Sequence, residues 1–429
     1  MMFLPTVYQT VRIFFLGDMP GDWGFNIASQ LSWVNLFYEV IQEALILPLF
    51  FLLGKSLKDK AEFENKVRGG LIVTAVAYLV VSSVLIIFAK PFVVFMAQDG
   101  VLVDATVDYI RLETVAALFS TVWRFMLLVL VTLKKDKYMY IALGVQMALS
   151  ILLDMFLISG LSFSAKIGVN GIAIANMITN FFVLCFAVIV LYREDIKIFR
   201  RIKISFQWMK EWFKVGKYSG IESFLRNFAF MMMIIRMVNV VAEQGNYWVA
   251  NNFIWNWLLL PGLTLADLVK KEIGENESSI KEKTFGYISL VAIFALFWLA
   301  TIPLWKPFLH YVMNVEDYQM VFNIVLIQTA FYLTFLFNSC IFDSTFYGLG
   351  KTNYMLIQSI CIDAVYYGFM FILYVTGVFV PTILGISLMF GIGMTLDFIP
   401  TMILYIYMLK KKGIKIDFKL DNMELPQST

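Results

Sequence analysis

The sequence predicts an all-α polytopic membrane protein, with twelve transmembrane helices in two parallel-repeat six-helix lobes around a central cavity. Three observations predict this fold. Of the 429 residues, 60% are hydrophobic and only 15% are charged, whereas about 25% are charged in an ordinary soluble domain. Apolar runs of about 20 residues, the length that crosses a bilayer, follow one another along nearly the whole chain. Short motifs of the first half recur in the second half. A soluble enzyme is therefore excluded.

Each predicted span of the first half is an apolar run that stops at a charged or turn-forming cluster. The first is short and ends at a Gly-Asp turn, and the second runs to a lysine-rich loop. The third ends at Lys90-Pro91, the fourth at a cluster of lysines, the fifth at a glycine and the sixth at Arg193. In order, the runs cover 2–17, 24–53, 69–89, 104–133, 138–160 and 168–192.

The second half contains six runs that end in the same ways. They stop before Glu243, at a pair of lysines, at Lys306-Pro307, at a glycine-rich turn, at Gly377 and at the lysines of the tail. In order, they cover 218–241, 246–269, 285–306, 318–347, 353–377 and 380–409. Every run contains enough apolar residues to be read as a helix that crosses the membrane or nearly crosses it.

The positive charges are distributed on one side of these spans. Most of the 34 Lys and Arg residues lie in every second connection, namely 54–68, 134–137, 193–217, 270–283, Lys351 and 410–419. Cytoplasmic loops retain Lys and Arg. Both termini are therefore predicted to lie in the cytoplasm, which requires an even number of spans. We expect a multi-pass protein of the plasma (inner) membrane.

Recurring motifs place the domain boundaries. Lys90-Pro91-Phe92 recurs as Lys306-Pro307-Phe308, and Tyr138-Met139 recurs as Tyr354-Met355 at the same offset. Six spans in each half give both repeats the same orientation, so the axis that relates them lies along the membrane normal. The basic central segment is expected to lie in the inner interface as a linker. The predicted organisation is an N-terminal lobe at 1–192, a cytoplasmic linker at 193–217, a C-terminal lobe at 218–409 and a cytoplasmic tail at 410–429.

Two stretches and one turn resemble a known family. Residues 149–158 (LSILLDMFLI) followed by 168–176 (GVNGIAIAN) resemble the fifth and sixth helices of the multidrug and toxic compound extrusion (MATE) family. The turn 348–352 resembles that family's loop after helix ten. MATE proteins belong to the multidrug/oligosaccharidyl-lipid/polysaccharide exporter (MOP) superfamily. The resemblance implies a secondary-active exporter of amphipathic, mostly cationic compounds, which it exchanges for Na+ or H+ by alternating access.

Two alternatives to a multidrug exporter stay open. One is a flippase for a lipid-linked oligosaccharide or another anionic substrate, whose signature is a cavity lined by Arg12, Arg124, Arg226 and Arg236. The other is a transport-inactive membrane scaffold, in which all intramembrane charges are neutralised as pairs. The sequence contains no Walker, HExxH or nucleophile-elbow motif, so we do not expect an enzyme. The expected partners are a small amphipathic substrate and membrane lipids, without nucleic acid, and the expected state is a monomer without a cofactor.

Two glutamates in the second span are candidates for ion coupling. Ionisable residues inside a span are costly and usually mark ion or substrate pathways. Glu39 and Glu43 lie one helical turn apart on one face. Two carboxylates at this separation do not both ionise easily in a low dielectric, which suits proton coupling or the binding of a cation. Alternatively, they pair with arginines such as Arg12 or Arg124 and only hold helices together.

Asp154 lies where the resemblance places the first-lobe cation site. Asn176 and Ser150 supply an amide and a hydroxyl there, and oxygen ligands of these types suit a hard cation such as Na+. However, Arg12 occupies by spacing the position of the family's first-helix aspartate. Because arginine keeps its charge, we expect it to form an ion pair with Asp154 and to take the place of the mobile cation. The first-lobe sodium site is then altered or lost.

The second lobe supplies a further set of charged residues. Glu222 and Arg226 lie one turn apart and are predicted to bridge along one helix face. The remaining candidates are Arg236, Asp343, Asp363 and Asp397, and each aspartate either faces the cavity or pairs with an arginine. Acidic residues outnumber basic ones within the spans, which favours a cationic substrate. The arginines leave an anionic or zwitterionic substrate open, because guanidinium groups bind phosphate and carboxylate.

Overall fold

The computed structural model describes residues 3–19, 23–196 and 204–416. Over these residues it is built from helices, with no strand. By contacts the chain divides into two compact units, the first formed by Phe3–Val249 with His310–Glu316 and the second by Ala250–Leu309 with the chain from Asp317. The predicted lobe boundaries at 192 and 218 stay a prediction. Parts of the predicted linker and tail, 197–203 and 417–429, lie outside the described residues.

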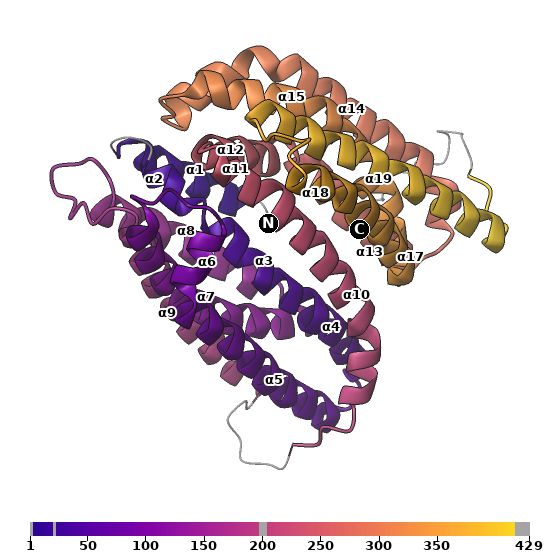
Figure 1. Ribbon diagram of the computed structural model, residues 1–429. Helices are drawn as coiled ribbons and strands as arrows, with labels where there is room; N and C mark the ends of the chain where they lie inside the picture. The colour runs from indigo at the N-terminus through magenta and orange to yellow at the C-terminus, as the bar shows by residue number, and fades with distance from the viewer. Residues whose placement is uncertain (1–2, 20–22, 197–203, 417–429) are drawn as a thin grey trace. The chain divides into compact units, whose positions relative to one another are not determined.

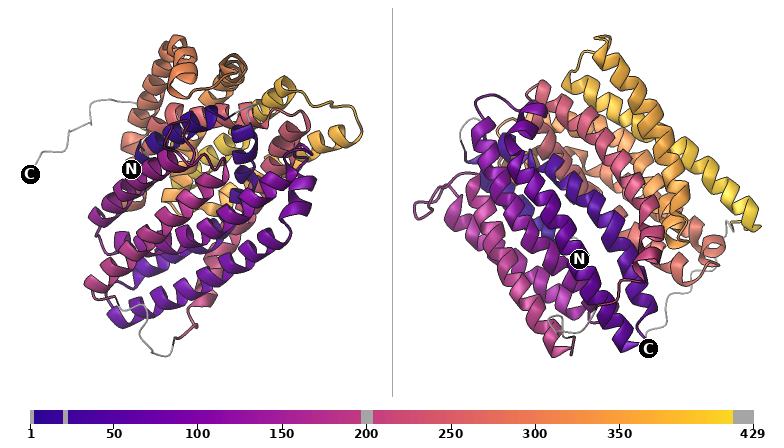
Figure 2. Two further views of the ribbon diagram at one scale, coloured as in Figure 1. Left: turned by 90° about the vertical axis from the view of Figure 1, so that its left-hand side faces the viewer. Right: turned by 60° about the horizontal axis from the view of Figure 1, so that its bottom comes forward.

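The first unit contains the helices labelled α1 to α11 and most of α12 (Figures 1 and 2). Helix α7 packs most extensively against α9 and also contacts α5 and α8, while α1 packs against α8. Labels beginning with η denote π-helical turns. The elements are α1 (Phe3–Gly17), α2 (Trp23–Ala28), α3 (Leu31–Ile41), η2 (Gln42–Ile46), α4 (Leu47–Lys55), α5 (Lys60–Ile87), α6 (Ala89–Phe95), α7 (Val103–Thr132), α8 (Lys137–Leu157), α9 (Asn170–Arg193), α10 (Met209–Phe230), η3 (Met231–Ile235), α11 (Arg236–Val240) and α12 (Gln244–Phe253).

The second unit continues from the end of α12. Its most extensive contact is between α15 and α19. Helix α19 begins where the Thr382 side chain accepts the Gly385 N–H and ends at Gly413, whose φ of 67° is the left-handed conformation that glycine adopts readily. The elements are η4 (Ile254–Leu258), α13 (Leu260–Glu275), α14 (Ser279–Pro307), η5 (Phe308–Val312), α15 (Tyr318–Phe337), η6 (Asn338–Asp343), α16 (Ser344–Gly348), α17 (Thr352–Ser359), η7 (Ile360–Tyr366), α18 (Tyr367–Val375) and α19 (Ile383–Lys412).

Each of the twelve predicted spans has a helical counterpart. Among the described residues, 8 helices are long and apolar enough to cross a membrane. The other four predicted spans correspond to α1, to α2–α4, to α10–α11 and to α12–α13. The last three are runs of helix interrupted by π-helical turns or short breaks. The predicted all-α polytopic fold is therefore confirmed.

The exposure of side chains is inverted relative to a soluble protein. Leu79, Phe182 and Leu296 are 54%, 55% and 67% exposed, whereas Arg12 and Asp154 are 6% and 1% exposed. Exposed apolar side chains are favourable in contact with lipid, while ionisable residues turn toward the interior of a bundle. The chain is thus a multi-pass membrane protein.

A π-helical turn precedes a proline at corresponding places in the two halves. Turn η2 is followed by α4 with Pro48 in its first turn, and η4 is followed closely by α13 with Pro261 in its first turn. Proline has no N–H and is tolerated at a helix start, and π-helical turns often occur at functional sites. This π-helical turn followed by a proline interrupts the second and the eighth predicted spans. Its occurrence in both halves supports the predicted repeat.

The end of the predicted linker is helical and packed. Helix α10 begins at Met209, ahead of the predicted start of the span at 218. Trp212 is 1% exposed, and its indole Nε1 donates a hydrogen bond of 2.8 Å to the Leu45 carbonyl. This part of the linker therefore packs into the core of the first unit, while the predicted position of the linker at the membrane interface stays a prediction.

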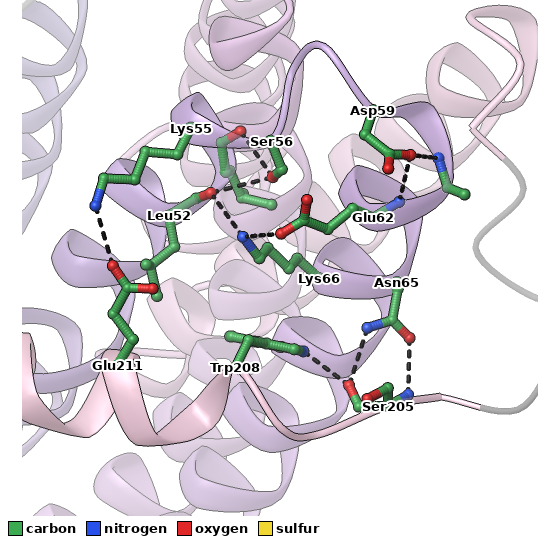
Figure 3. Close-up of polar contacts among 12 residues, drawn as sticks. Leu52, Lys55, Ser56, Asp59, Glu62, Asn65, Lys66, Ser205, Trp208 and Glu211 are labelled. Atoms are coloured by element: carbon green, nitrogen blue, oxygen red, sulfur yellow. Dashed lines mark hydrogen bonds and ion pairs between the residues drawn. The ribbon is translucent and has the colours of Figure 1, made fainter.

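Polar contacts hold the chain that enters α10 against the end of α4 and the first turns of α5 (Figure 3). Asn65 Nδ2 donates to the Ser205 carbonyl at 2.9 Å, and the Ser205 N–H donates to Asn65 Oδ1 at 2.8 Å. Trp208 Nε1 donates to the same carbonyl at 2.8 Å. Lys55 Nζ lies 3.0 Å from Glu211 Oε1. The start of α10 is thereby fixed beside η2, which carries one of the candidate glutamates.

Candidate functional site

The first unit contains a cavity of about 780 Å³. Helices α1, α3, α7, α8 and α9 and turn η2 contribute to its wall. The lining includes amides and hydroxyls as well as apolar and aromatic side chains. Its charged lining residues are Arg12, Glu39, Glu43, Glu113 and Arg124.

The pattern of α7 explains why a polar cavity forms in an apolar bundle. Near its start, Val107 and Ile110 belong to one buried apolar cluster. Near its end, Leu127 and Leu130 belong to a second. Between them, residues at helical spacing present one polar face to the cavity, namely Glu113, Ala117, Ser120, Thr121 and Arg124. Apolar packing at both ends thus holds the polar middle open.

Arg12 and Asp154 form a buried ion pair between α1 and α8. Arg12 Nε donates to Asp154 Oδ2 at 2.7 Å, and Nη2 donates to Oδ1 at 3.2 Å. Their side chains are 7% and 1% exposed. Parallel bonds of this kind are the strongest geometry that a guanidinium and a carboxylate adopt. The ion pair predicted from sequence is confirmed.

The two side chains predicted to supply oxygen ligands beside Asp154 are Asn176 and Ser150, and Asn176 binds a different carboxylate. Asn176 donates its Nδ2 to Glu113 Oε1, and Tyr109 donates to the same oxygen at 3.5 Å. Ser150 is buried and lines the cavity. The guanidinium of Arg12 therefore binds Asp154, while the amide that we expected beside Asp154 satisfies Glu113. The possible Na+ site at Asp154 stays a prediction.

A second charged group joins α3, η2 and α10. Arg226 lies 3.0 Å from Glu39 Oε1 through Nη1, 2.9 Å from Glu43 Oε1 through Nη2, and 3.1 Å from Glu222 Oε1 through Nε. We call these four residues the Arg226 cluster. The predicted bridge between Glu222 and Arg226 is confirmed. Glu39 and Glu43 do pair with an arginine, but this arginine is Arg226 on α10 and neither Arg12 nor Arg124.

Two glycines explain how α10 approaches η2 so closely. A Cβ at Gly216 would lie 2.1 Å from the Ala44 carbonyl oxygen, and one at Gly220 would lie 2.8 Å from the Ala44 Cβ. Only a residue without a side chain permits this contact. Glu43 is adjacent to Ala44, and its Oε2 is buried without a hydrogen-bond partner among the described residues. The close packing thus brings Arg226 to one oxygen of Glu43 and leaves the other unsatisfied.

The remaining predicted residues lie elsewhere. Arg236 donates from Nε to the Phe95 carbonyl at 2.9 Å and does not line this cavity. Asp397 belongs to α19 of the second unit, where its Oδ2 accepts bonds of 2.9 Å from Asn338 and 2.8 Å from Gln358. The other two predicted aspartates also belong to the second unit, Asp343 in η6 and Asp363 in η7.

A network of buried amides in the first unit was not predicted from the sequence. Gln30 and Asn239 exchange hydrogen bonds of 3.0 and 3.1 Å, and Gln244 donates to Gln98 at 2.8 Å. Gln30 also donates to Gln98 at 3.4 Å. The available signal was the presence of amides at the margins of apolar runs, where an unpaired amide is costly.

No group of three or more His, Cys, Asp or Glu side chains in the described ranges is arranged to hold a metal ion. The three glutamates of the Arg226 cluster instead turn toward a guanidinium.

Known proteins match this chain in structure. No sequence model of a protein family matches the chain, and no curated protein matches it in sequence. Solved structures do match. The inward-facing conformation of a multidrug resistance MATE family transporter of the MOP superfamily aligns with a TM-score of 0.74 and 16% identity, over 95% of this chain and 95% of that chain. This chain has the MATE transporter fold.

Two further structures extend the comparison to the MATE fold. The structure of the MATE multidrug transporter DinF-BH aligns with a TM-score of 0.72 and 16% identity, over 96% of this chain and 93% of that one. A MOP superfamily transporter from Pyrococcus furiosus aligns with a TM-score of 0.67 and 17% identity, over 96% and 95%. The reverse polarity of that transporter's binding pocket suggests a different function for it. The MATE resemblance expected from sequence is thus confirmed in the fold.

Proposed function

We propose that the protein is a secondary-active exporter of amphipathic organic compounds, driven by inward movement of Na+ or H+ through alternating access. One observation carries this proposal. Three carboxylates share the guanidinium of Arg226, and two of them, Glu39 and Glu43, line the 780 Å³ cavity. Secondary transporters of this fold class couple substrate movement to ions bound inside the membrane.

The Arg226 cluster has the charge balance of a coupling site. With all three glutamates ionised, these four residues would carry a net negative charge in a low dielectric, where unbalanced charge is costly. A bound proton or monovalent cation removes this excess. The buried Oε2 of Glu43, which has no hydrogen-bond partner among the described residues, supplies the atom at which such an ion would bind. Protonation of Glu43 would weaken its ion pair with Arg226, and release of the proton would restore it, which links ion binding to the contact between η2 and α10.

The Arg12–Asp154 pair is assigned a structural role in this scheme. Its two hydrogen bonds satisfy both carboxylate oxygens of Asp154. The carboxylate has no oxygen left that lacks a donor, unlike that of Glu43. We therefore propose that coupling has moved from the position of Asp154 to the Arg226 cluster.

The cavity wall is compatible with a small amphipathic substrate. Amides of Gln9, Asn35 and Gln146 provide polar contacts, while Phe125 and Leu128 provide apolar ones. Pockets of roughly 300–1,000 Å³ hold drug-sized molecules. We further propose that the protein acts in the plasma membrane as a monomer with both termini in the cytoplasm, as the distribution of lysines and arginines indicates.

Transport by proteoliposomes tests this function. An outward-directed H+ or Na+ gradient should drive uptake of ethidium, a fluorescent amphipathic cation, into vesicles that contain the wild-type protein, and one of the two ions should suffice. Glu43→Gln should abolish this uptake. Glu316→Gln, which alters an exposed glutamate outside the cavity, should not. Absence of both gradient-driven ethidium uptake and coupled ion movement in the wild type would contradict the proposal.

A flippase for a lipid-linked oligosaccharide is the second candidate, and one observation favours it. Arg12 and Arg124 both line the cavity, as the flippase alternative predicts. Two of the four predicted arginines are therefore present in the wall, while Arg226 and Arg236 are not among its lining residues. The inactive scaffold is not favoured, because Arg124 forms no ion pair within the described part of the chain.

A further inference from the structure

We propose that the cavity of the first unit binds an anionic group of its ligand, a phosphate or a carboxylate, at the guanidinium of Arg124. This inference rests on the proposed transport function in one respect, since it treats the cavity as the place of the substrate. The inference goes beyond that function because it specifies the charge of the group that the cavity binds. The MATE fold alone does not specify this charge.

The charges that line the cavity separate into those that are satisfied and one that is not. Arg12 binds Asp154, Glu39 and Glu43 bind Arg226, and Glu113 accepts from Asn176 and Tyr109. Every lining carboxylate thus has a donor from the protein. Arg124 is the one charged lining residue that has neither a hydrogen bond nor an ion pair among the described residues, and its side chain is exposed in the cavity.

A guanidinium that has no ion pair among the described residues requires explanation in a membrane protein. Arginine keeps its positive charge in proteins, and intramembrane charges usually pair or mark a substrate pathway. A ligand that binds Arg124 must be negative or accept hydrogen bonds. A phosphate or carboxylate satisfies both conditions and fits the guanidinium with two parallel hydrogen bonds.

A fixed platform supports Arg124. Its guanidinium carbon lies 5.7 Å from the centroid of the Trp123 ring. Trp123 is 3% exposed, and its Nε1 donates to Asn180 Oδ1 at 3.1 Å. A cation over a held aromatic ring loses little conformational entropy when it binds an anion. The site is therefore organised before the ligand arrives.

Other donors of the wall extend the polar surface. Thr179 lines the same cavity, is 1% exposed, and has a hydroxyl without a hydrogen-bond partner in the described part of the chain. The side-chain amides of Gln42 and Gln146 also line the cavity and make no hydrogen bond within the described ranges. Phosphate and carboxylate oxygens accept bonds from groups of these kinds.

The two ends of the polar face of α7 differ in charge. Glu113 and Arg124 are separated by three turns of one helix, a distance of about 16 Å along its axis. Glu113 lies beside the satisfied Arg12–Asp154 pair, and Arg124 lies toward the end of α7 that precedes the lysine-rich loop. An amphipathic molecule with an acidic head group can therefore place this group at Arg124 and its apolar part against Phe125 and Leu128.

Ligand-induced stabilisation of purified protein in a neutral detergent tests the proposal. The probes are dihexanoyl phosphatidic acid, dihexanoyl phosphatidylcholine and inorganic phosphate, at constant ionic strength. The phosphatidic acid should raise the melting temperature saturably, because a ligand that binds only the folded state stabilises it. The zwitterionic phosphatidylcholine should do so much less. Arg124→Gln should weaken the binding of the acidic probe at least about tenfold, as loss of a charge-assisted hydrogen bond predicts.

A matched control is available on the same helix. Arg111 is exposed, donates from Nε to the Ile86 carbonyl at 3.3 Å, and does not line the cavity. Arg111→Gln should leave the affinity for the acidic probe unchanged. Inorganic phosphate that acts saturably through Arg124 would identify the free anion as sufficient. A response to the acidic lipid alone would identify an amphipathic anion, and either result supports the proposal.

A second measurement uses the wild-type protein and does not depend on folding of a variant. Phenylglyoxal modifies accessible arginines, and mass spectrometry locates the product. The acidic probe should protect Arg124 from modification and should not protect Arg111. Equal modification of Arg124 with and without the probe would overturn the proposal, as would a thermal response that is unchanged in Arg124→Gln. Neither assay requires an ion gradient, so failure of gradient-driven transport alone would contradict only the proposed function.

Discussion

Arg12 Nε lies 2.7 Å from Asp154 Oδ2, and a second hydrogen bond of 3.2 Å joins Arg12 Nη2 to Oδ1. Both side chains are almost fully buried. The permanent charge of Arg12 therefore occupies the position at which a mobile cation would otherwise meet Asp154. Because of this relationship, we place the proposed coupling site at the Arg226 cluster and not at Asp154.

Removal of one member of the buried pair should be strongly destabilising. We expect Asp154→Asn to lower the free energy of unfolding by about 3–5 kcal/mol, because it leaves a buried guanidinium without its counter-charge. The double variant Arg12→Met with Asp154→Leu should recover most of this loss. Thermal unfolding in a neutral detergent measures both. Asp104→Asn, which breaks the exposed pair with Lys90, should change stability little.

Sodium should not act through Asp154 in the wild-type protein. We expect the dependence of the melting temperature on Na+ to be the same in the wild type and in Asp154→Asn, since Arg12 already satisfies both oxygens. The measurement is a titration with NaCl against KCl at constant ionic strength. A sodium response that disappears in Asp154→Asn and survives in Arg12→Ala would contradict the assignment.

Because α10 packs closely against η2, a side chain at Gly216 should destabilise the protein. Gly216→Ala should destabilise the protein by about 1–3 kcal/mol, because its Cβ would overlap a backbone carbonyl that cannot move alone. Gly144→Ala is the matched control, since a Cβ at Gly144 in α8 meets nothing within 4 Å. This control should be neutral or slightly stabilising. Equal melting temperatures for the two variants would argue against the close contact.

One ion pair outside the spans predicts a pH effect. A hydrogen bond from Lys135 Nζ, 3.0 Å from Glu194 Oε2, lowers the pKa of Glu194, and a bond of 3.1 Å from the Tyr138 hydroxyl lowers it further. A carboxylate with a lowered pKa stabilises the fold above its ordinary pKa, and this contribution is lost as the pH falls through the folded-state pKa. The wild type should thus melt above Glu194→Gln at neutral pH.

The two proteins should converge in melting temperature at a pH below the ordinary glutamate pKa of about 4.3. Glu316→Gln, which alters an exposed glutamate, should differ from the wild type by an amount that varies less with pH. A difference between wild type and Glu194→Gln that grows as the pH falls would have the wrong sign and would exclude the assigned cause.

Hydrophobic runs predicted the helices well because crossing a bilayer imposes one length and one composition on every span. Spacing along a single helix was equally informative, and it correctly predicted that Glu222 and Arg226 would bridge. Correspondence with a family position also correctly paired Arg12 with Asp154. The first relationship depends on helical periodicity, and the second depends on the resemblance to the MATE family.

Pairing between helices of distant sequence was harder to predict. The contact of Glu39 and Glu43 with Arg226 depends on how far α10 approaches η2, which Gly216 and Gly220 set through their lack of a side chain. The hydropathy of the sequence does not reveal how closely two helices pack. The π-helical turns were equally hidden, because a single shifted hydrogen-bond register leaves no compositional trace. Likewise, only the structure shows that Arg124 has no ion pair among the described residues.

The decisive measurement for coupling at the Arg226 cluster is the melting temperature of purified protein across Na+ concentration and pH, compared among wild type, Glu43→Gln and Asp154→Asn. We predict a saturable response to Na+ or to protons in the wild type, its loss in Glu43→Gln, and its retention in Asp154→Asn. A response that survives in Glu43→Gln but is lost in Asp154→Asn would contradict coupling at the Arg226 cluster. So would a flat response in the wild type.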